Sequence, residues 1–483
     1  MYSRRWFLAA ALAGSTGPLL FSRSASARNI PFQRTLPLPQ LIDARKEGNK
    51  LKLVARRGRH SFFDNVYTST AGYSSEVLGP AVRVHKGDEI AVAVENSLAR
   101  STTVHWHGLI IPSHADGGPH NAFAPGETWQ TKFKIDQPEC TAWFHPHPHG
   151  DTARQVYSGL SGLLLIEDGT GEGLKLPRTY GIDDIPIVLQ DRSFADDGSL
   201  YYEDAPFVTM MGMRGDVVVA NGVWAPVVKI PLGLVRLRIL NGSNARNYNL
   251  AFDDRRVFHV VASDGGYLPR PVPMKTLLIA PGERFELVVD FSKGGSAILE
   301  TGADEFAPMM GMMRDRASDA ARILKLETAP ELTVSDSTLP DVLIPLKSPD
   351  STTSLRRRTF VLNDHMMGMG MMGNSGMAIN GRSFAMNRID STVSLGSTEI
   401  WQVDSQMLAH PFHVHGVQFR TLSLNGRKPP EHLQGRKDTI LIARTAEILV
   451  TFTQPATREH PFMYHCHILE HEDAGMMGQY ITA

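Results

Sequence analysis

The protein has 483 residues, a length that suggests roughly three domains of ordinary size. Its 49 lysines and arginines are balanced by 50 aspartates and glutamates, so the net charge gives no electrostatic reason to expect a nucleic-acid partner. With 42% hydrophobic and 8% aromatic residues, the composition is that of a globular protein, which argues against a disordered chain.

The first 27 residues predict an export signal. Arg4 and Arg5 precede an apolar run, and residues 25–27 are small, as at a signal-peptidase site. The run is too short for a transmembrane helix, so we expect no stable membrane span. The paired arginines resemble the twin-arginine signal, and an ordinary secretory leader is the alternative. We therefore expect the twin-arginine export machinery as a partner, and a periplasmic or otherwise exported location.

One strand pattern recurs along the rest of the chain. Period-two alternation dominates and long amphipathic helical patterns are scarce, which predicts an all-β fold. Ala124-Pro125-Gly126-Glu127 recurs as Ala280-Pro281-Gly282-Glu283, with Ala446-Glu447 as a weaker third echo. Histidines follow the first and third copies at equal offsets, whereas the middle copy has lost them. The repeats predict three domains, each the size of a Greek-key sandwich or barrel, at residues 40–170, 180–328 and 355–483.

Ten histidines and one cysteine are concentrated in four short segments. These are His105-Trp106-His107, His145-Pro146-His147, His410-Pro411-Phe412-His413-Val414-His415, and His465-Cys466-His467 with His471. On a strand, His-x-His places both rings on one face, and neutral imidazole is the commonest metal ligand. Scattered surface or core histidines are the alternative for a single pair but do not explain four repeat-related clusters. A structural zinc site would use only four ligands.

The segment around Cys466 predicts two metal centres on opposite sides of one strand. Alternation turns Cys466 away from His465 and His467, and His471 and Met476 follow at intervals of five residues. A thiolate, two imidazoles and a weak thioether form the ligand set of a blue, type 1 copper site. The second imidazole must come from another strand, and His410 is the candidate. The eight remaining imidazoles would face each other across an interdomain cleft and would suit three metal ions.

In these four segments, and above all in residues 465–477, the chain resembles the three-domain multicopper oxidases. That family includes bacterial laccases, copper-tolerance cuprous oxidases and bilirubin oxidases, and the resemblance covers essentially the whole mature chain. It implies three cupredoxin-like Greek-key β-sandwich or barrel domains, with no copper ligands in the second and a type 1 copper in the third. It also implies four copper ions: one type 1, one type 2 and two type 3.

The resemblance assigns a ligand set to each copper ion. The type 1 copper takes His410, Cys466, His471 and axial Met476. The type 2 copper takes His105 and His413. One type 3 copper takes His107, His145 and His467, and the other takes His147, His415 and His465. Asp116 and Glu472 are implied to lie near the trinuclear cluster and its proton path, the alternative being that they are ordinary solvated acids.

The activity implied by the resemblance is an oxidase reaction. One-electron oxidation of cuprous ion, phenols or aromatic amines would be coupled to four-electron reduction of dioxygen to water, in copper tolerance. The alternatives are a general laccase without a copper-homeostasis role, an exported copper-sequestering protein, a copper-free scaffold like the cell-division relatives of the family, and a copper nitrite reductase.

Methionine-rich segments bear on the choice of substrate. Six methionines lie within residues 366–377, four lie within 309–313, and a smaller group is Met210-Met211-Gly212-Met213. The interspersed glycines favour surface loops, and soft thioethers select Cu(I). Candidate ligands of a substrate copper ion are Met366, Met367, Met369, Met371 and Met372. The alternative is gap-filling methionine or a pliable apolar lid.

The sequence departs from the cuprous-oxidase branch just before its third histidine segment. That branch carries a carboxylate and a thioether there, whereas this chain reads Gln406-Met407-Leu408-Ala409. Asp404 and Met407 are the candidates to replace them. The second cysteine, Cys140, is predicted to be a buried thiol.

Overall fold

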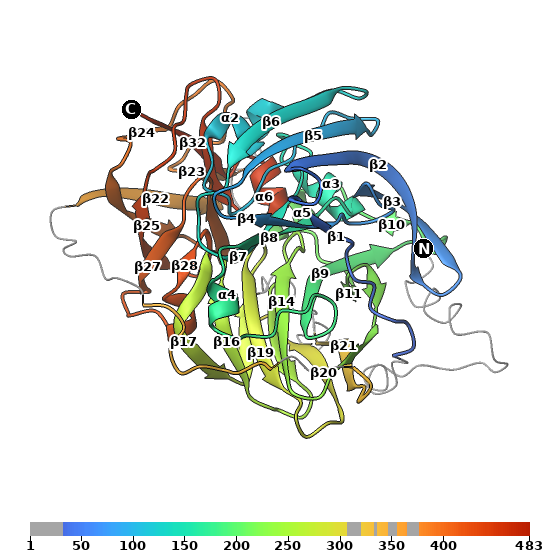
Figure 1. Ribbon diagram of the computed structural model, residues 1–483. Helices are drawn as coiled ribbons and strands as arrows, with labels where there is room; N and C mark the ends of the chain where they lie inside the picture. The colour runs from blue at the N-terminus through green and yellow to red at the C-terminus, as the bar shows by residue number, and fades with distance from the viewer. Residues whose placement is uncertain (1–31, 307–319, 333–335, 346–354, 365–375) are drawn as a thin grey trace.

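The computed structural model describes residues 32–306, 320–332, 336–345, 355–364 and 376–483, and these form mainly strands joined by a few short helices (Figure 1). The all-β prediction is confirmed. The predicted leader at residues 1–27 and the candidate methionines at residues 366–372 lie outside the described residues.

The first part of the chain forms two four-stranded sheets, with strand orders β1-β4-β8-β7 and β3-β2-β5-β6. Alternation explains the second sheet, because Ile90, Val92 and Val94 of one strand all point into the core. The strands are β1 (Leu41–Asp43), β2 (Lys50–Phe63), β3 (Val66–Tyr73), β4 (Ala81–His85), β5 (Glu89–Ser97), β6 (Thr128–Lys134), β7 (Cys140–Phe144) and β8 (Gly162–Glu167).

The middle part of the chain forms an eight-stranded sheet packed with a five-stranded sheet. The orders are β12-β11-β9-β14-β19-β16-β17, with β10 on β9, and β13-β21-β20-β15-β18. The strands are β9 (Asp184–Phe194), β10 (Leu200–Tyr201), β11 (Val217–Ala220), β12 (Val223–Trp224), β13 (Val227–Ile230), β14 (Leu234–Asn241), β15 (Tyr248–Phe252), β16 (Phe258–Ser263), β17 (Gly266–Met274), β18 (Thr276–Ile279), β19 (Arg284–Asp290), β20 (Ser296–Gly302) and β21 (Ala321–Thr328).

The last part forms a six-stranded sheet, β23-β22-β25-β30-β27-β28, and a five-stranded sheet, β24-β32-β31-β26-β29. The strands are β22 (Arg356–Asp364), β23 (Met377–Ile379), β24 (Ser391–Val393), β25 (Thr398–Ser405), β26 (His410–Val414), β27 (Phe419–Leu424), β28 (Arg436–Lys437), β29 (Thr439–Ile442), β30 (Thr445–Thr451), β31 (Phe462–Cys466) and β32 (Met477–Thr482).

One strand arrangement occurs in all three parts and explains the sequence repeat. A parallel pair, β2 with β5, β9 with β14 and β22 with β25, is extended by antiparallel β6, β19 and β30 respectively. The repeated Ala-Pro-Gly-Glu turns end directly before β6 and β19, and the weaker echo falls at the start of β30. Each pair of sheets draws its strands from one of the three predicted ranges, while the domain boundaries themselves stay a prediction.

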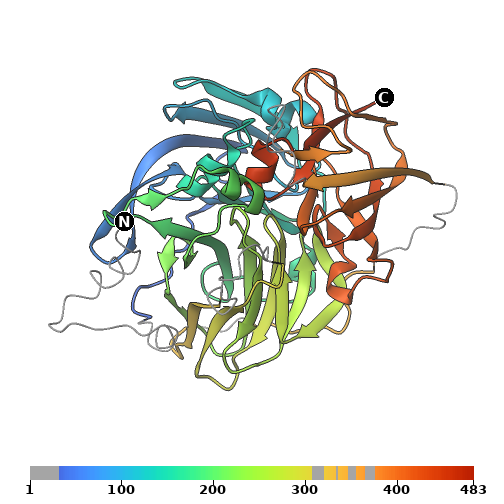
Figure 2. The same cartoon turned by 180° about the vertical axis from the view of Figure 1, so that it is seen from behind.

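Short helices lie where the three parts meet. They are α2 (Ser113–Asp116), η1 (Pro119–Asn121), α3 (Thr152–Ser158), α4 (Thr170–Gly173), α5 (Pro206–Met211), η3 (Glu431–Leu433) and α6 (Leu469–Asp473). Helix α6, from the end of the chain, contacts α3 of the first part and α5 of the middle part, as Figures 1 and 2 show from opposite sides. None of the helices in the described part of the chain has the length and apolar character that a membrane crossing requires.

Candidate metal centre

Strands β26 and β31 lie side by side and carry four of the eight predicted ligands of the last part, and the other four follow shortly after these strands. They pair antiparallel, with Phe412 opposite Cys466 and His413 opposite His465. Because side chains alternate along a strand, Cys466 and His465 point to opposite faces. The strand therefore divides the predicted ligands into a thiol group and a histidine group, as the sequence pattern predicts.

The thiol group consists of three side chains in mutual contact. Cys466 Sγ lies 3.3 Å from Nδ1 of His410 and 3.6 Å from Nδ1 of His471, and the two ring nitrogens are 3.2 Å apart. All three residues are fully buried. Met476 is also buried and lies alongside, since its N–H donates to the His471 carbonyl and its carbonyl accepts from the Cys466 N–H.

The histidine group brings together eight rings from two distant parts of the chain. His105 Nε2 lies 3.4 Å from His413 Nε2, the predicted type 2 pair. His465 Nε2 lies 3.2 Å from Nε2 of both His147 and His415, the predicted ligands of one type 3 copper. The rings of the other predicted type 3 set lie within 5.7 Å of one another, measured between centroids, and are His107, His145 and His467.

Burial keeps the rings neutral, which is the form that binds metal. Desolvation, reinforced by neighbouring histidines, lowers the pKa well below its usual value for His107, His145, His147, His413, His415 and His467. Burial lowers the pKa of His465 and of His471 to about 3. Burial also raises the pKa of the Cys466 thiol well above its usual value.

Several ring nitrogens inside the group are buried without any protein partner. They are His107 Nδ1, His145 Nε2 and both ring nitrogens of His467. A buried polar atom without a partner costs about 1–3 kcal/mol, so natural cores rarely contain several in contact. Metal ions would supply the missing partners. The donor set and its orphaned atoms thus fit a metal cluster.

Asp116 and Glu472 hold the outer nitrogens of these rings. Asp116 Oδ2, in α2, lies 2.7 Å from His415 Nδ1 and 3.3 Å from His105 Nδ1. The two carboxylate oxygens of Glu472, in α6, each lie 3.2 Å from a ring nitrogen, one on His147 and the other on His465. Burial, with the nearby Asp473 carboxylate, raises the pKa of Glu472 well above its usual value. Neither acid is solvated.

Comparison with known proteins agrees with this geometry. Multicopper oxidase family models match residues 55–171, 231–297 and 350–483. The multicopper oxidase mco of Staphylococcus haemolyticus (strain JCSC1435) is 36% identical over 451 residues, which cover 91% of each chain. This chain belongs to the multicopper oxidase family. The protein is therefore an oxidase that has copper as its cofactor and dioxygen as its electron acceptor.

Two further relatives differ in what their names describe. The laccase-like multi-copper oxidase CueO from the lignin-degrading bacterium Ochrobactrum sp. is 43% identical, with a TM-score of 0.86, covering 93% of this chain and all of that one. The cell division protein FtsP of Xenorhabdus nematophila (strain ATCC 19061) is 36% identical over 486 residues, covering 99% of this chain and 98% of that one.

Next to the thiol group of this multicopper oxidase, the structure places a carboxylate that the sequence did not reveal. Asp364 Oδ2, at the end of β22, lies 3.2 Å from His410 Nε2 and accepts the Leu408 N–H at 2.8 Å. Burial opposes ionisation of Asp364, but the contacts with His410 and Leu408 outweigh it and lower the pKa. The sequence suggests Asp404 and Met407 for this place near the third histidine segment. The Asp404 carboxylate accepts a hydrogen bond from the Gln402 side chain, and Met407 is 57% exposed.

His471, the second histidine of the thiol group, faces a methionine-containing helix. His471 Nε2 donates to the Met210 carbonyl of α5 at 2.9 Å. A cavity of about 450 Å³ lies on the same helix, and its lining includes Phe207, Met211 and Met213. The small methionine group predicted as a surface loop is therefore partly helical, and it covers the His471 edge.

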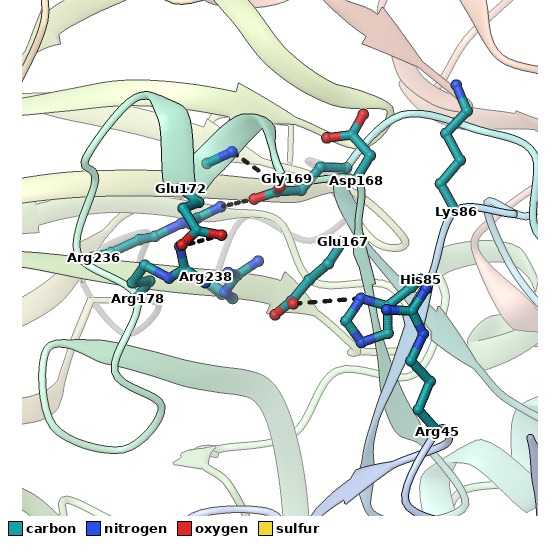
Figure 3. A pocket seen from close by; sticks show the side chains of 12 residues that line it. Arg45, His85, Lys86, Glu167, Asp168, Gly169, Glu172, Arg178, Arg236 and Arg238 are labelled. Carbon is teal, nitrogen blue, oxygen red and sulfur yellow. Dashed lines mark hydrogen bonds and ion pairs between the residues drawn. The ribbon is translucent and has the colours of Figure 1, made fainter. Parts of the chain in front are cut away.

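A separate cavity of about 490 Å³, shown in Figure 3, is lined by none of the predicted site residues. Its charged side chains pair with one another, as Arg178 does with Glu172 at 3.3 Å and His85 does with Glu167 at 3.8 Å. Arg236 and Arg238 reach it from β14 and pair with Glu286. Among the described residues, none of the groups whose ligand atoms lie close enough to hold a metal ion is at this cavity.

Cys140 is buried and forms no disulfide, as predicted. It lies on β7, where Gln137 Nε2 donates weakly to its sulfur at 3.6 Å. Burial raises the pKa of this thiol to about 12, so it remains protonated and unreactive at neutral pH.

Proposed function

We propose that the protein is an exported four-copper oxidase that takes single electrons from Cu(I) and from phenols or aromatic amines, and that it acts in copper tolerance. The proposal rests on one observation: strand β31 and the residue after it separate a buried Cys-His-His group from eight buried histidines. A copper-sequestering protein would have no use for the eight histidines. A copper-free scaffold would not require the buried thiol group.

The residues present fit the four proposed ions. His410, Cys466, His471 and Met476 would hold the type 1 copper, and the eight histidines would hold one type 2 and two type 3 coppers. Bound copper would supply one-electron redox steps and a place for dioxygen to react. For His107 the free nitrogen is Nδ1, because Asp438 and Thr439 already contact Nε2.

Cys466 would connect the two groups through the backbone. Its covalent neighbours His465 and His467 belong to the histidine group, so the path between the groups needs no diffusing carrier. The Ile468 N–H donates to Cys466 Sγ at 3.3 Å and helps to hold the sulfur in place. Four electrons entering singly at the thiol side would thus reach the side where dioxygen takes up all four.

Asp116 and Glu472 would relay the protons that the reaction consumes. Reduction of dioxygen to water consumes four protons, and both of these buried carboxyl groups touch predicted ligands through Nδ1. Glu472 lies beside Asp473, whose pKa is raised to about 7 by burial and by nearby carboxylates. The Asp473 carboxylate accepts hydrogen bonds from the N–H groups of Thr152 and Ala153, which connects the Glu472–Asp473 pair to α3.

Two edges of the thiol group are candidates for electron entry. His410 Nε2 contacts the Asp364 carboxylate, and Asp364 is followed in the sequence by the methionine-rich residues 366–372. This edge would suit a cuprous donor. His471 Nε2 donates to the Met210 carbonyl beside the cavity of about 450 Å³, whose mixed polar and apolar lining includes Phe207, Met211 and Met213 for contact with an aromatic donor. The name of the Ochrobactrum relative mentions lignin model compounds, which supports the aromatic route.

Metal content is the direct test of this function. We expect the copper-loaded protein to hold four copper ions per chain, to be blue, and to unfold at a higher temperature than the copper-free protein, because ligands that bind only the folded state stabilise it. Elemental analysis, the optical spectrum and calorimetry check this. Copper bound only at the type 1 site would point to another enzyme class, and absence of tight copper binding would point to a scaffold.

The methionine segment is tested by changing Met366, Met367, Met369, Met371 and Met372 together to serine. Loss of an outer partner of a metal site costs about 10–100-fold, so losing direct thioether donors should raise KM for Cu(I) at least about tenfold. A bulky organic dye should be oxidised nearly as before. Oxygen uptake under buffered Cu(I) measures both donors, and Met386→Ser, at a methionine that is 39% exposed, is the control.

Comparing Cu(I) with the dye distinguishes a structural role of this segment from a role in binding Cu(I). Equal losses for both would show that the segment is structural, and an unchanged KM for Cu(I) would make the protein a general laccase.

A further inference from the structure

The middle part of the chain contains no predicted copper ligand, yet one of its side chains reaches the histidine group. Arg284, the first residue of β19, is fully buried. Its two terminal nitrogens lie 2.7 and 2.6 Å from the two carboxylate oxygens of Asp438. This is the bidentate arrangement in which arginine fixes a carboxylate in both position and rotation.

Asp438 in turn contacts two predicted ligands that belong to different ions. Its Oδ1 lies 3.0 Å from His107 Nε2, and its main-chain carbonyl lies 2.8 Å from His413 Nδ1. The hydroxyl oxygen of Thr439 lies 3.1 Å and 3.2 Å from the same two nitrogens. The two rings are stacked, with centroids 3.7 Å apart.

These acceptors decide which nitrogen each ring presents to a metal. His107 donates through Nε2 and is left with Nδ1, whereas His413 donates through Nδ1 and is left with Nε2. Partners of this kind set the tautomer and orientation of metal-binding histidines. One aspartate thus sets opposite donor atoms on two neighbouring rings.

The remaining donors of Arg284 prevent the guanidinium from turning. Nε donates to the Thr141 carbonyl of β7 at 3.0 Å. The terminal nitrogens also donate to the carbonyls of Gly282 and Asp264, at 3.0 and 3.2 Å. Arg284 therefore ties β7, its own sheet and the segment of Asp438 together at one point.

Two glycines allow close packing here, one at the Arg284–Asp438 contact and the other at the histidine group. A Cβ at Gly108, directly after His105-Trp106-His107, would lie 2.5 Å from an Arg284 nitrogen and 2.8 Å from Asp438 Oδ2. A Cβ at Gly282, in the repeated turn, would lie 2.9 Å from the His467 ring. Both glycines have positive φ, at +92° and +83°. The middle repeat, although without ligands, packs directly against the cluster.

A second set of buried charges holds the backbone of the same segment. Lys437 Nζ lies 3.0 Å from Asp264 Oδ2 and 3.1 Å from Glu283 Oε1. Asp264 Oδ2 also accepts the N–H groups of Asp438 and Thr439, at 3.2 and 3.3 Å. The Asp438 segment is thus held by the middle part through both its side chains and its main chain.

We propose that Arg284 is a positioning residue for dioxygen reduction, and that through Asp438 it sets the orientation of His107 and His413. The copper-free middle part thereby controls the geometry of the trinuclear cluster. The inference rests on the proposed function, because it takes those two histidines to be copper ligands.

The test compares Arg284→Lys with Arg236→Lys in the copper-loaded full chain. Lysine keeps the charge but loses the fork that grips both carboxylate oxygens. For Arg284→Lys we expect a full blue absorption that donors still bleach without oxygen, an altered type 2 electron paramagnetic resonance signal, and a kcat for oxygen uptake lowered about 10–100-fold. The ratio kcat/KM for the donor should not change, because it reports only donor oxidation, which the substitution leaves untouched.

Arg236→Lys is the matched control. Arg236 is as deeply buried as Arg284 and also pairs with a carboxylate, Glu286, but its hydrogen bonds and ion pairs within the described part of the chain include no predicted ligand. We expect its type 2 signal and kcat to be those of the wild type. An equal change in both variants would overturn the proposal by showing a general effect on the fold, and so would an unchanged signal and kcat in a folded Arg284→Lys protein.

A charge-neutral variant covers the case in which Arg284→Lys does not fold. Arg284→Met combined with Asp438→Asn removes one buried charge of each sign, so no unpaired charge remains from this contact. The proposal requires this protein to keep its type 1 copper and to lose or alter its type 2 signal, and a normal type 2 signal would overturn it. A wild-type protein without any type 2 signal would instead refute the four-copper function itself.

Discussion

Replacing Cys466 with serine is expected to abolish the blue colour and donor oxidation together. The colour of a type 1 site comes from a copper-bound thiolate, and a serine hydroxyl is neither anionic at neutral pH nor a soft ligand. Since Cys466 is also the covalent link to the histidine group, turnover should fall at least about a thousandfold, equivalent to roughly 4 kcal/mol of activation free energy.

The fold should survive this substitution, because serine is slightly smaller than cysteine and the neighbouring backbone bonds remain. The visible spectrum, oxygen uptake and the type 2 resonance signal are measured on one preparation. Cys140→Ser is the matched control, since Cys140 is equally buried but lies on β7 and touches no predicted ligand. A Cys466→Ser protein with normal turnover would remove the electron-entry assignment.

Replacing His413 or His467 with alanine should have the opposite signature. Oxygen consumption should fall to background, while the protein stays blue and donors still bleach it under anaerobic conditions. Their rings belong to the histidine group, where His413 Nε2 lies 3.4 Å from His105 Nε2. The thiol group therefore keeps all its members in both variants. Readmitting oxygen should not restore the colour at an appreciable rate.

His149→Ala is the control for these two variants. His149 follows the second histidine segment, is exposed, packs edge-on against Phe384 and has no predicted ligand role. Its removal should leave both bleaching and oxygen uptake unchanged. If the His413 or His467 variants bleached and also consumed oxygen at the wild-type rate, the division of the ligands into two groups would be wrong.

The sequence was sufficient to predict the features that follow from strand alternation and from the repeated turns. Alternation along a strand places Cys466 and His465 on opposite faces of β31 wherever that strand lies. His105 and His107 lie outside the named strands, with His105 in an isolated bridge to His145. The recurring Ala-Pro-Gly-Glu turn likewise predicted repeated units, because equal turns precede equivalent strands such as β6 and β19. The all-β fold and the two-sided arrangement of the predicted ligands follow from these short-range rules.

Only the tertiary structure could decide which distant side chains hold those ligands. Asp404, on β25, is close to His410 in sequence, but its carboxylate accepts a hydrogen bond from Gln402. Asp364 lies 46 residues before His410, at the end of β22, which pairs parallel with β25, and it contacts the His410 ring. Arg284 reaches Asp438 across 154 residues and has no local pattern to mark it. Such contacts depend on how sheets pack and which buried charges must pair, and no residue spacing encodes that.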